Sequence, residues 1–224
     1  MQQILVKEQT TDVQALKHLL LQRKITKDRF RIPYSADQVF TIMKAAYMAE
    51  VEFRHRTFKE DRYVISNLKR ISEYLSSNSS KFGIMLCGVY GNGKTTMLYA
   101  FQNVINFLVD KDVFHSKDVG IRIIDTRELV SISRDNKEFS RALNYGMIGI
   151  EDLGKEQTGI VDYGNLINPV IELIEYRYNR QLFTFITTNL TPKEIRSKYG
   201  DRIADRFNEM LEVMIFENGT YRNQ

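Results

Sequence analysis

The segment "CGVYGNGKTTM" (87–97) constrains the fold of this chain more than any other. It follows the apolar run "FGIML" and opens the apolar segment "KTTMLYAFQNVINFLVD", so it joins a predicted strand to a predicted helix. Its three glycines, at positions 88, 91 and 93, permit backbone dihedrals that other residues rarely adopt. The segment therefore predicts a tight turn between a strand and a helix.

The same turn fits the pattern G-x-x-x-x-G-K-[ST] of a phosphate-binding loop. Such a loop turns backbone N–H groups toward phosphate oxygens, and the helix that follows adds its N-terminal dipole. We expect Lys94 to contact the β- and γ-phosphates of ATP and Thr95 to bind Mg²⁺. The predicted nucleotide-binding residues are Gly88, Gly91, Asn92, Gly93, Lys94, Thr95 and Thr96.

Short apolar strands alternate with helices around and after this loop. The predicted strands are "FGIMLCG", "VGIRIID", "LNYGMIGIED", "QLFTFITTN" and "LEVMIFE". The predicted helices after the first strand are "KTTMLYAFQNVINFLVD", "TRELVSISR", "NLINPVIELIEYRYNR" and "PKEIRSKYGDRIADRF". This alternation predicts an α/β domain at 60–224, with a parallel five-stranded sheet and helices on both faces.

Residues 1–59 are predicted to form a small helical module that contacts a partner or DNA. Residues 12–22 have apolar residues at helical spacing, and Ser35 with Gln38 forms a capping box that opens a second helix. A third helix is expected at 60–76. Residues 1–60 hold 11 Lys/Arg against 7 Asp/Glu, while residues 61–224 hold 21 of each. The basic and aromatic stretch "EFRHRTFK" (52–59) is a candidate DNA or partner contact, although an ordinary solvated face explains the charge equally well.

Polar side chains end two of the predicted strands. Glu151 and Asp152 follow the apolar residues of "MIGIEDLG", and Asn189 ends "TFITTN". Two adjacent carboxylates can divide the work at a phosphate site, one holding Mg²⁺ and the other orienting the attacking water. We expect the Asn189 amide to face the γ-phosphate or that water.

Residues 82–222 resemble the AAA+ ATPases, and within them the DnaC/IstB-type group of bacterial helicase loaders and transposition helpers. The resemblance rests on "GVYGNGKTT", "IGIEDLG", "LIEYRYNRQLFTFITTNL", "YGDRIADRF" and "TYR", in this order. It implies the Walker A residues Lys94 and Thr95, the sensor-1 residue Asn189, an arginine finger at Arg206 with Arg202 as a second candidate, and a sensor-2-like Arg222. Spacing alone favours an exposed i,i+4 arginine pair that flanks Asp205.

One motif departs from this family, which usually places Asp first and Glu second at the acidic strand end. Here Glu151 precedes Asp152, so the carboxylate in the water-activating position is one methylene short. A different alignment makes Asp152 the metal residue, with no catalytic carboxylate after it. Both alignments predict slow, switch-like hydrolysis of ATP.

The resemblance implies a DnaC-like helicase loader that binds ATP–Mg²⁺ and single-stranded DNA, self-associates through its ATP sites and acts on a replicative helicase. An IstB-like helper of DNA transposition, with a transposase as partner, is the first alternative. A P-loop kinase for a small metabolite is the second. With 35 residues after Asn189, a lidless AAA+ domain is expected.

The remaining composition predicts a cytoplasmic protein. The apolar runs are shorter than the roughly 20 residues of a membrane span, and the first residues lack the pattern of a secretory signal. The single cysteine, Cys87, excludes an intrachain disulfide and a cysteine zinc site. Its apolar neighbours predict a buried, unreactive thiol.

Overall fold

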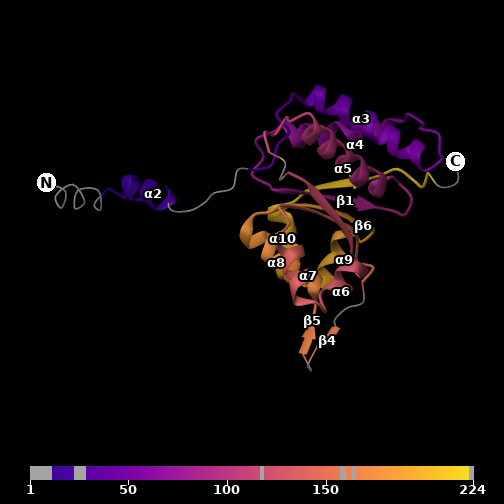
Figure 1. The fold of residues 1–224 in the computed structure, drawn as a ribbon. Coiled ribbons are helices and arrows are strands. Elements are labelled where there is room, and N and C mark those ends of the chain that lie inside the picture. The colour runs from indigo at the N-terminus through magenta and orange to yellow at the C-terminus, as the bar shows by residue number, and fades with distance from the viewer. Residues whose placement is uncertain (1–11, 23–28, 117–118, 157–159, 163–164, 222–224) are drawn as a thin grey trace.

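Five parallel strands form the centre of the molecule (Figure 1). The computed structural model describes residues 12–22, 29–116, 119–156, 160–162 and 165–221. The strands lie in the order β2-β3-β6-β1-β7, and each neighbouring pair is parallel. Their bounds are β1 Gly83–Gly88, β2 Ile121–Asp125, β3 Met147–Leu153, β6 Phe183–Thr188 and β7 Glu212–Phe216. The predicted parallel α/β sheet is confirmed.

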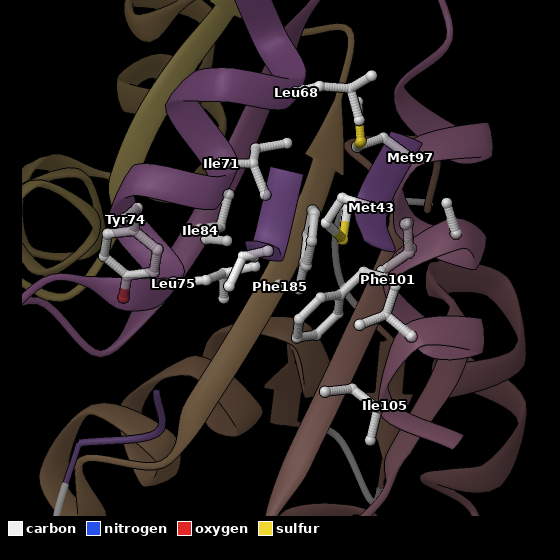
Figure 2. Packing of buried hydrophobic residues seen from close by; sticks show 14 of the residues in the cluster. Met43, Leu68, Ile71, Tyr74, Leu75, Ile84, Met97, Phe101, Ile105 and Phe185 are labelled. Carbon is white, nitrogen blue, oxygen red and sulfur yellow. The ribbon is translucent and has the colours of Figure 1, made fainter. Parts of the chain in front are cut away.

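One face of the sheet is covered by α3 (Ala36–Phe53), α4 (Arg62–Ser76) and α5 (Lys94–Asp110). These helices and the strand residues beneath them share one hydrophobic core, part of which Figure 2 shows. Met43 of α3, Leu68 of α4 and Phe101 of α5 are all fully buried there, against Phe185 of β6. The division into 1–59 and 60–224 stays a prediction, but α3 belongs to the same core as the sheet.

The opposite face is covered by α6 (Thr126–Ile132), α7 (Asn136–Asn144), α8 (Pro169–Arg180), α9 (Pro192–Tyr199) and α10 (Asp201–Met210). Successive residues of β1 alternate between the two layers, as the pleat of a strand requires. Ile84 and Leu86 pack in the α3–α5 core, while Met85 and Cys87 pack in the core beneath α6–α10. Only 4% of Cys87 is exposed, so the predicted buried cysteine is confirmed.

Three predicted helix or strand boundaries were wrong. The helix expected from 165 begins at Pro169 with Asn168 as its N-cap, because Asn165–Ile167 forms β5, which pairs with β4 (Ile160–Asp162) in an antiparallel hairpin. The third predicted strand begins at Met147, since residues 136–144 form α7. The last predicted helix is two helices, α9 and α10, which meet at Gly200 with φ 83°.

The N-terminal helices begin where the sequence predicts. α2 spans Val13–Gln22, and Ser35 and Gln38 form the expected capping box at the start of α3. None of the helices in the described ranges is long and apolar enough to cross a membrane. Because all five strands are parallel, their C-terminal ends meet at one edge of the sheet. This edge brings together Gly88 after β1, Leu153 of β3 and Thr188 of β6.

Candidate nucleotide-binding site

The loop between β1 and α5 depends on its glycines. Gly88, Gly91 and Gly93 have φ values of 151°, 76° and 96°, which residues other than glycine rarely adopt. Gly93 is also the N-cap of α5, and a Cβ atom there would lie 2.4 Å from the Tyr47 hydroxyl oxygen. Glycine therefore allows the loop a closely packed shape without backbone strain, and the loop leads directly into the N-terminus of α5.

Lys94, the first residue of α5, places its ammonium group inside this loop. Its Nζ donates hydrogen bonds to the carbonyls of Gly88 and Val89, both at 2.8 Å, and to the Asn92 side chain at 3.0 Å. A fourth bond, of 2.9 Å, reaches Oδ1 of Asn189 at the end of β6. Only 5% of Lys94 is exposed, so a buried positive charge lies where the loop, the helix terminus and β6 converge.

The acidic residues Glu151 and Asp152 lie near the C-terminal end of β3, and their carboxylates have different partners. The Tyr99 hydroxyl on α5 donates to Oε2 of Glu151 at 3.2 Å, one helical turn after Thr95. Asp152 forms an ion pair with Lys155, and its Oδ1 lies 3.4 Å from Nδ2 of Asn189. Glu151 thus lies toward the helix of the phosphate loop, and Asp152 lies toward Asn189.

A pocket of about 860 Å³ joins these groups. It is lined by predicted residues that lie far apart in the sequence: Gly91, Asn92, Gly93, Lys94, Thr95, Thr96, Glu151, Asp152 and Asn189. The fold therefore gathers nearly all of the predicted nucleotide-binding and acidic residues around one cavity. Gly88 contributes through its carbonyl to Lys94.

The basic stretch predicted as a DNA or partner contact also lies on this pocket. Residues 54–59 line it, together with Lys94 and Lys155. The cationic side chains of the lining are Arg54, Arg56, Lys59, Lys94 and Lys155, against the carboxylates Glu151 and Asp152. Five positive groups and two negative groups give the described lining an excess of positive charge, which favours a polyanionic ligand.

Two apolar residues of the lining were not predicted from the sequence, Tyr47 of α3 and Val64 of α4. They line the pocket with Phe58 of the predicted basic and aromatic stretch, and the Tyr47 and Phe58 ring centroids are 6.1 Å apart. Burial raises the pKa of Tyr47 to about 12, so its hydroxyl stays protonated at neutral pH. Tyr221 lines the same region from beyond β7. The motif "TYR" contributes to the family resemblance, but the sequence alone predicts no role for its tyrosine.

The predicted finger residues lie outside the described lining of this pocket. Arg202 and Arg206 are on α10, and both form ion pairs with Glu175 of α8, the second at 2.8 Å. The guanidinium of Arg206 also lies 4.9 Å from the centre of the Tyr178 ring. Arg222, the sensor-2-like candidate, falls outside the described residues.

The oxygen donors at the pocket fit a magnesium ion that a nucleotide brings with it. Thr95, Glu151 and Asp152 all line the cavity. Among the described residues no group of three or more His, Cys, Asp or Glu side chains forms a separate metal site. This set of donors is typical of phosphate sites, where Mg²⁺ is coordinated by one or two carboxylates and by the phosphates.

Comparison with solved structures finds similar folds among proteins of DNA replication. The crystal structure of the DnaC helicase loader superimposes with a TM-score of 0.54 and 21% identity, over 71% of this chain and 93% of that one. At this level of identity the likeness concerns the fold alone. For DnaI the TM-score is 0.53 and the identity 19%, over 71% of this chain and 87% of that chain.

A putative primosome component from Streptococcus pyogenes serotype M3 gives a TM-score of 0.50 and 17% identity, over 73% of this chain and 84% of that one. No family model and no curated protein sequence matches the chain. The structural likeness thus confirms the AAA+ fold that the motifs predict.

Proposed function

We propose that this chain is an AAA+ ATPase that binds ATP with Mg²⁺ and hydrolyses it slowly. The observation that carries the proposal is the position of Lys94 Nζ, within 3.0 Å of four oxygen atoms from the loop and from Asn189. An ammonium group held by neutral oxygens can exchange some of these partners for phosphate oxygens, which form stronger, charge-assisted hydrogen bonds. The surplus of positive side chains around the cavity supports the same ligand.

The two carboxylates take different roles in this proposal. Glu151 accepts a hydrogen bond from Tyr99, and Tyr99 lies on the same face of α5 as Thr95. Glu151 and Thr95 would therefore hold Mg²⁺. Bound Mg²⁺ would neutralise charge on the phosphate oxygens. Asp152, beside Asn189, would accept a proton from the attacking water. Its short side chain and its ion pair with Lys155 both work against that task, which supports slow hydrolysis.

Arg206 and Arg202 would act on the pocket of a neighbouring subunit. Both lie on α10, paired with Glu175 of α8, and neither is among the described residues that line the pocket of their own chain. An arginine supplied by a second subunit stabilises charge on the transferred phosphoryl group. ATP would then drive self-association, and the pair with Glu175 would keep Arg206 oriented before assembly.

The biological role that best fits is that of a DnaC-like helicase loader, acting on a replicative helicase and single-stranded DNA during replication. The likeness to the DnaC helicase loader over 93% of its length supports this role through the fold. An IstB-like transposition helper uses the same ATPase domain, so the partner decides between them. Binding of a purified replicative helicase supports the loader, and binding of a transposase instead supports the helper.

Light scattering with ADP and with ATP–Mg²⁺ tests the shared site. We expect the wild type to assemble only with ATP–Mg²⁺, and Arg206→Ala to stay monomeric. Arg141→Ala is the matched control, because Arg141 is also a helix residue ion-paired to a glutamate. A wild type that binds ATP and remains monomeric throughout would overturn the finger assignment and favour the kinase alternative.

DNA binding has its own test. If single-stranded DNA is bound through phosphate contacts, its affinity falls steeply between about 50 and 200 mM salt. An affinity that does not change over this range would contradict the proposed DNA binding but not the proposed binding and hydrolysis of ATP.

A further inference from the structure

The segment that follows β7 returns to the phosphate loop and bonds to it. Nδ2 of Asn218 donates to the Asn92 carbonyl at 2.9 Å, and the Tyr221 backbone N–H donates to the Gly91 carbonyl at 2.8 Å. In the other direction, Nδ2 of Asn92 donates to the Phe216 carbonyl at 3.1 Å. Two of these bonds fix carbonyls of the loop and the third fixes the Asn92 side chain, so the loop is tied to the chain at and beyond the end of β7.

The ring of Tyr221 is held in place by a residue from the other end of the chain. Its hydroxyl donates to Oδ2 of Asp61 at 2.7 Å, across 160 positions of sequence. The other carboxylate oxygen of Asp61 accepts the backbone N–H groups of Tyr63 and Val64, and so caps α4. Burial, then the bond to Asp61, raises the pKa of Tyr221, so the hydroxyl remains a donor at neutral pH.

This arrangement puts the Tyr221 ring on the apolar side of the pocket. The ring lines the pocket beside Tyr47, Phe58 and Val64. A Cβ atom on Gly93 would lie 3.7 Å from Cε2 of Tyr221, which places the ring edge next to the glycine that precedes Lys94. The phosphate loop and the aromatic side of the pocket therefore meet at Gly93.

We propose that residues 217–221 form a clasp on the nucleotide pocket, in which Tyr221, held by Asp61, contacts the nucleoside of the bound triphosphate. The proposal rests on the ATP binding proposed above and adds a specificity-determining residue to that site. Removal of the ring should weaken ligands that carry a base and spare ligands that have only phosphates. An aromatic ring offers a flat face to a base, which makes it the suitable side chain for this contact.

Competition binding with a fluorescent ATP analogue tests the clasp, with ATP, ADP and inorganic tripolyphosphate as competitors. Tyr221→Ala should weaken ATP and ADP by about tenfold or more, because a base–aromatic contact is lost. Its affinity for tripolyphosphate should stay within about twofold of the wild type. Tyr221→Phe, which keeps the ring and loses the hydroxyl bond, should weaken ATP by about threefold.

Asp61→Ser separates the two roles of Asp61, because serine still caps α4 but cannot reach Tyr221. It should match Tyr221→Phe, and the double variant should be no weaker than either single variant. Tyr176→Phe is the control, since it removes a tyrosine hydroxyl bonded to Asn144, outside the pocket.

Two results would overturn the clasp while the proposed function survives. One is a wild type and a Tyr221→Ala variant with equal affinity for ATP. The other is an equal loss for ATP and tripolyphosphate, which would mean that Tyr221 acts only on the shape of the loop. A wild type that binds no nucleotide would instead overturn the proposed function and the clasp together.

Discussion

Nζ of Lys94 lies 2.9 Å from Oδ1 of Asn189, so one hydrogen bond joins the loop after β1 to the end of β6. The other end of the Asn189 amide faces Asp152, with Nδ2 3.4 Å from Oδ1. A single amide therefore connects the cation that would bind phosphate to the carboxylate that would activate water. Movement of Lys94 toward a phosphate would change the partners of Asn189 and, through it, of Asp152.

Asn189→Ala should lower the rate of ATP hydrolysis by about 100-fold, because a positioned hydrogen-bonding group is lost from the site. The affinity for ATP should change much less, since Lys94 keeps its loop contacts. Single-turnover hydrolysis and equilibrium binding, measured on the same variant, separate the two effects. An equal loss in both would show that Asn189 acts in binding rather than in hydrolysis.

Lengthening the side chain of Asp152 and neutralising that of Glu151 separates the roles of the two residues. Asp152→Glu should raise the hydrolysis rate by about tenfold, because the added methylene brings the carboxylate nearer to the attacking water. Glu151→Gln should instead raise the Mg²⁺ concentration needed for tight ATP binding. Steady-state hydrolysis and magnesium titrations test these outcomes. Slower hydrolysis in Asp152→Glu, with normal magnesium dependence in Glu151→Gln, would contradict the assignment.

Arg177 of α8 is a stability element rather than a site residue. Its side chain is fully buried and donates to the carbonyls of Tyr145 and Phe183, at 2.8 and 2.6 Å, and to the Thr184 hydroxyl at 2.9 Å. Arg177→Met would remove these hydrogen bonds and should lower the free energy of unfolding by about 3 kcal/mol. Urea titration measures the loss.

Arg180→Met is the control for Arg177, because Arg180 is exposed on the same helix. It should change the free energy of unfolding by no more than about 0.5 kcal/mol. Equal losses in the two variants would show that helix α8, and not the buried contacts, sets the stability.

Cys87 should make the fold sensitive to alkaline pH. Burial raises the pKa of its thiol to about 11, above the ordinary value of 9.0, so the folded state favours the neutral thiol. The unfolded chain loses its proton first, so the thiol's contribution is complete below pH 9.0 and is lost as the pH rises toward 11. Unfolding free energies at pH 8 to 11 should therefore fall less steeply in Cys87→Ala than in the wild type. Identical slopes would contradict the burial argument.

The parts of the fold that the sequence predicts are those set by neighbours along the chain. The strand "FGIMLCG", the loop with Lys94 and the Ser35 cap all depend on residues within a few positions of one another. The sequence does not predict the hairpin of β4 and β5. The apolar residues of β5 run directly into those of α8, so the hydrophobic pattern favours one continuous helix.

The same distinction applies to the candidate site. Lys94 is predicted by the phosphate-loop pattern, and Glu151 and Asn189 are predicted because each lies at the end of an apolar strand; parallel strands end at one edge of the sheet. The Asp61–Tyr221 bond spans 160 positions, and the contact of Tyr47 with Gly93 depends on how α3 lies across α5. Neither leaves a periodic pattern, so only the folded chain reveals them.

Isothermal titration calorimetry of ATP–Mg²⁺ tests the central claim most directly. The wild type and Lys69→Ala, which changes an exposed lysine of α4, should bind ATP–Mg²⁺ with the same affinity. Lys94→Ala should bind about 100-fold more weakly, because it loses a charge-assisted contact to phosphate within the loop. Equal binding by Lys94→Ala and the wild type, or a wild type that binds no ATP, would contradict the account.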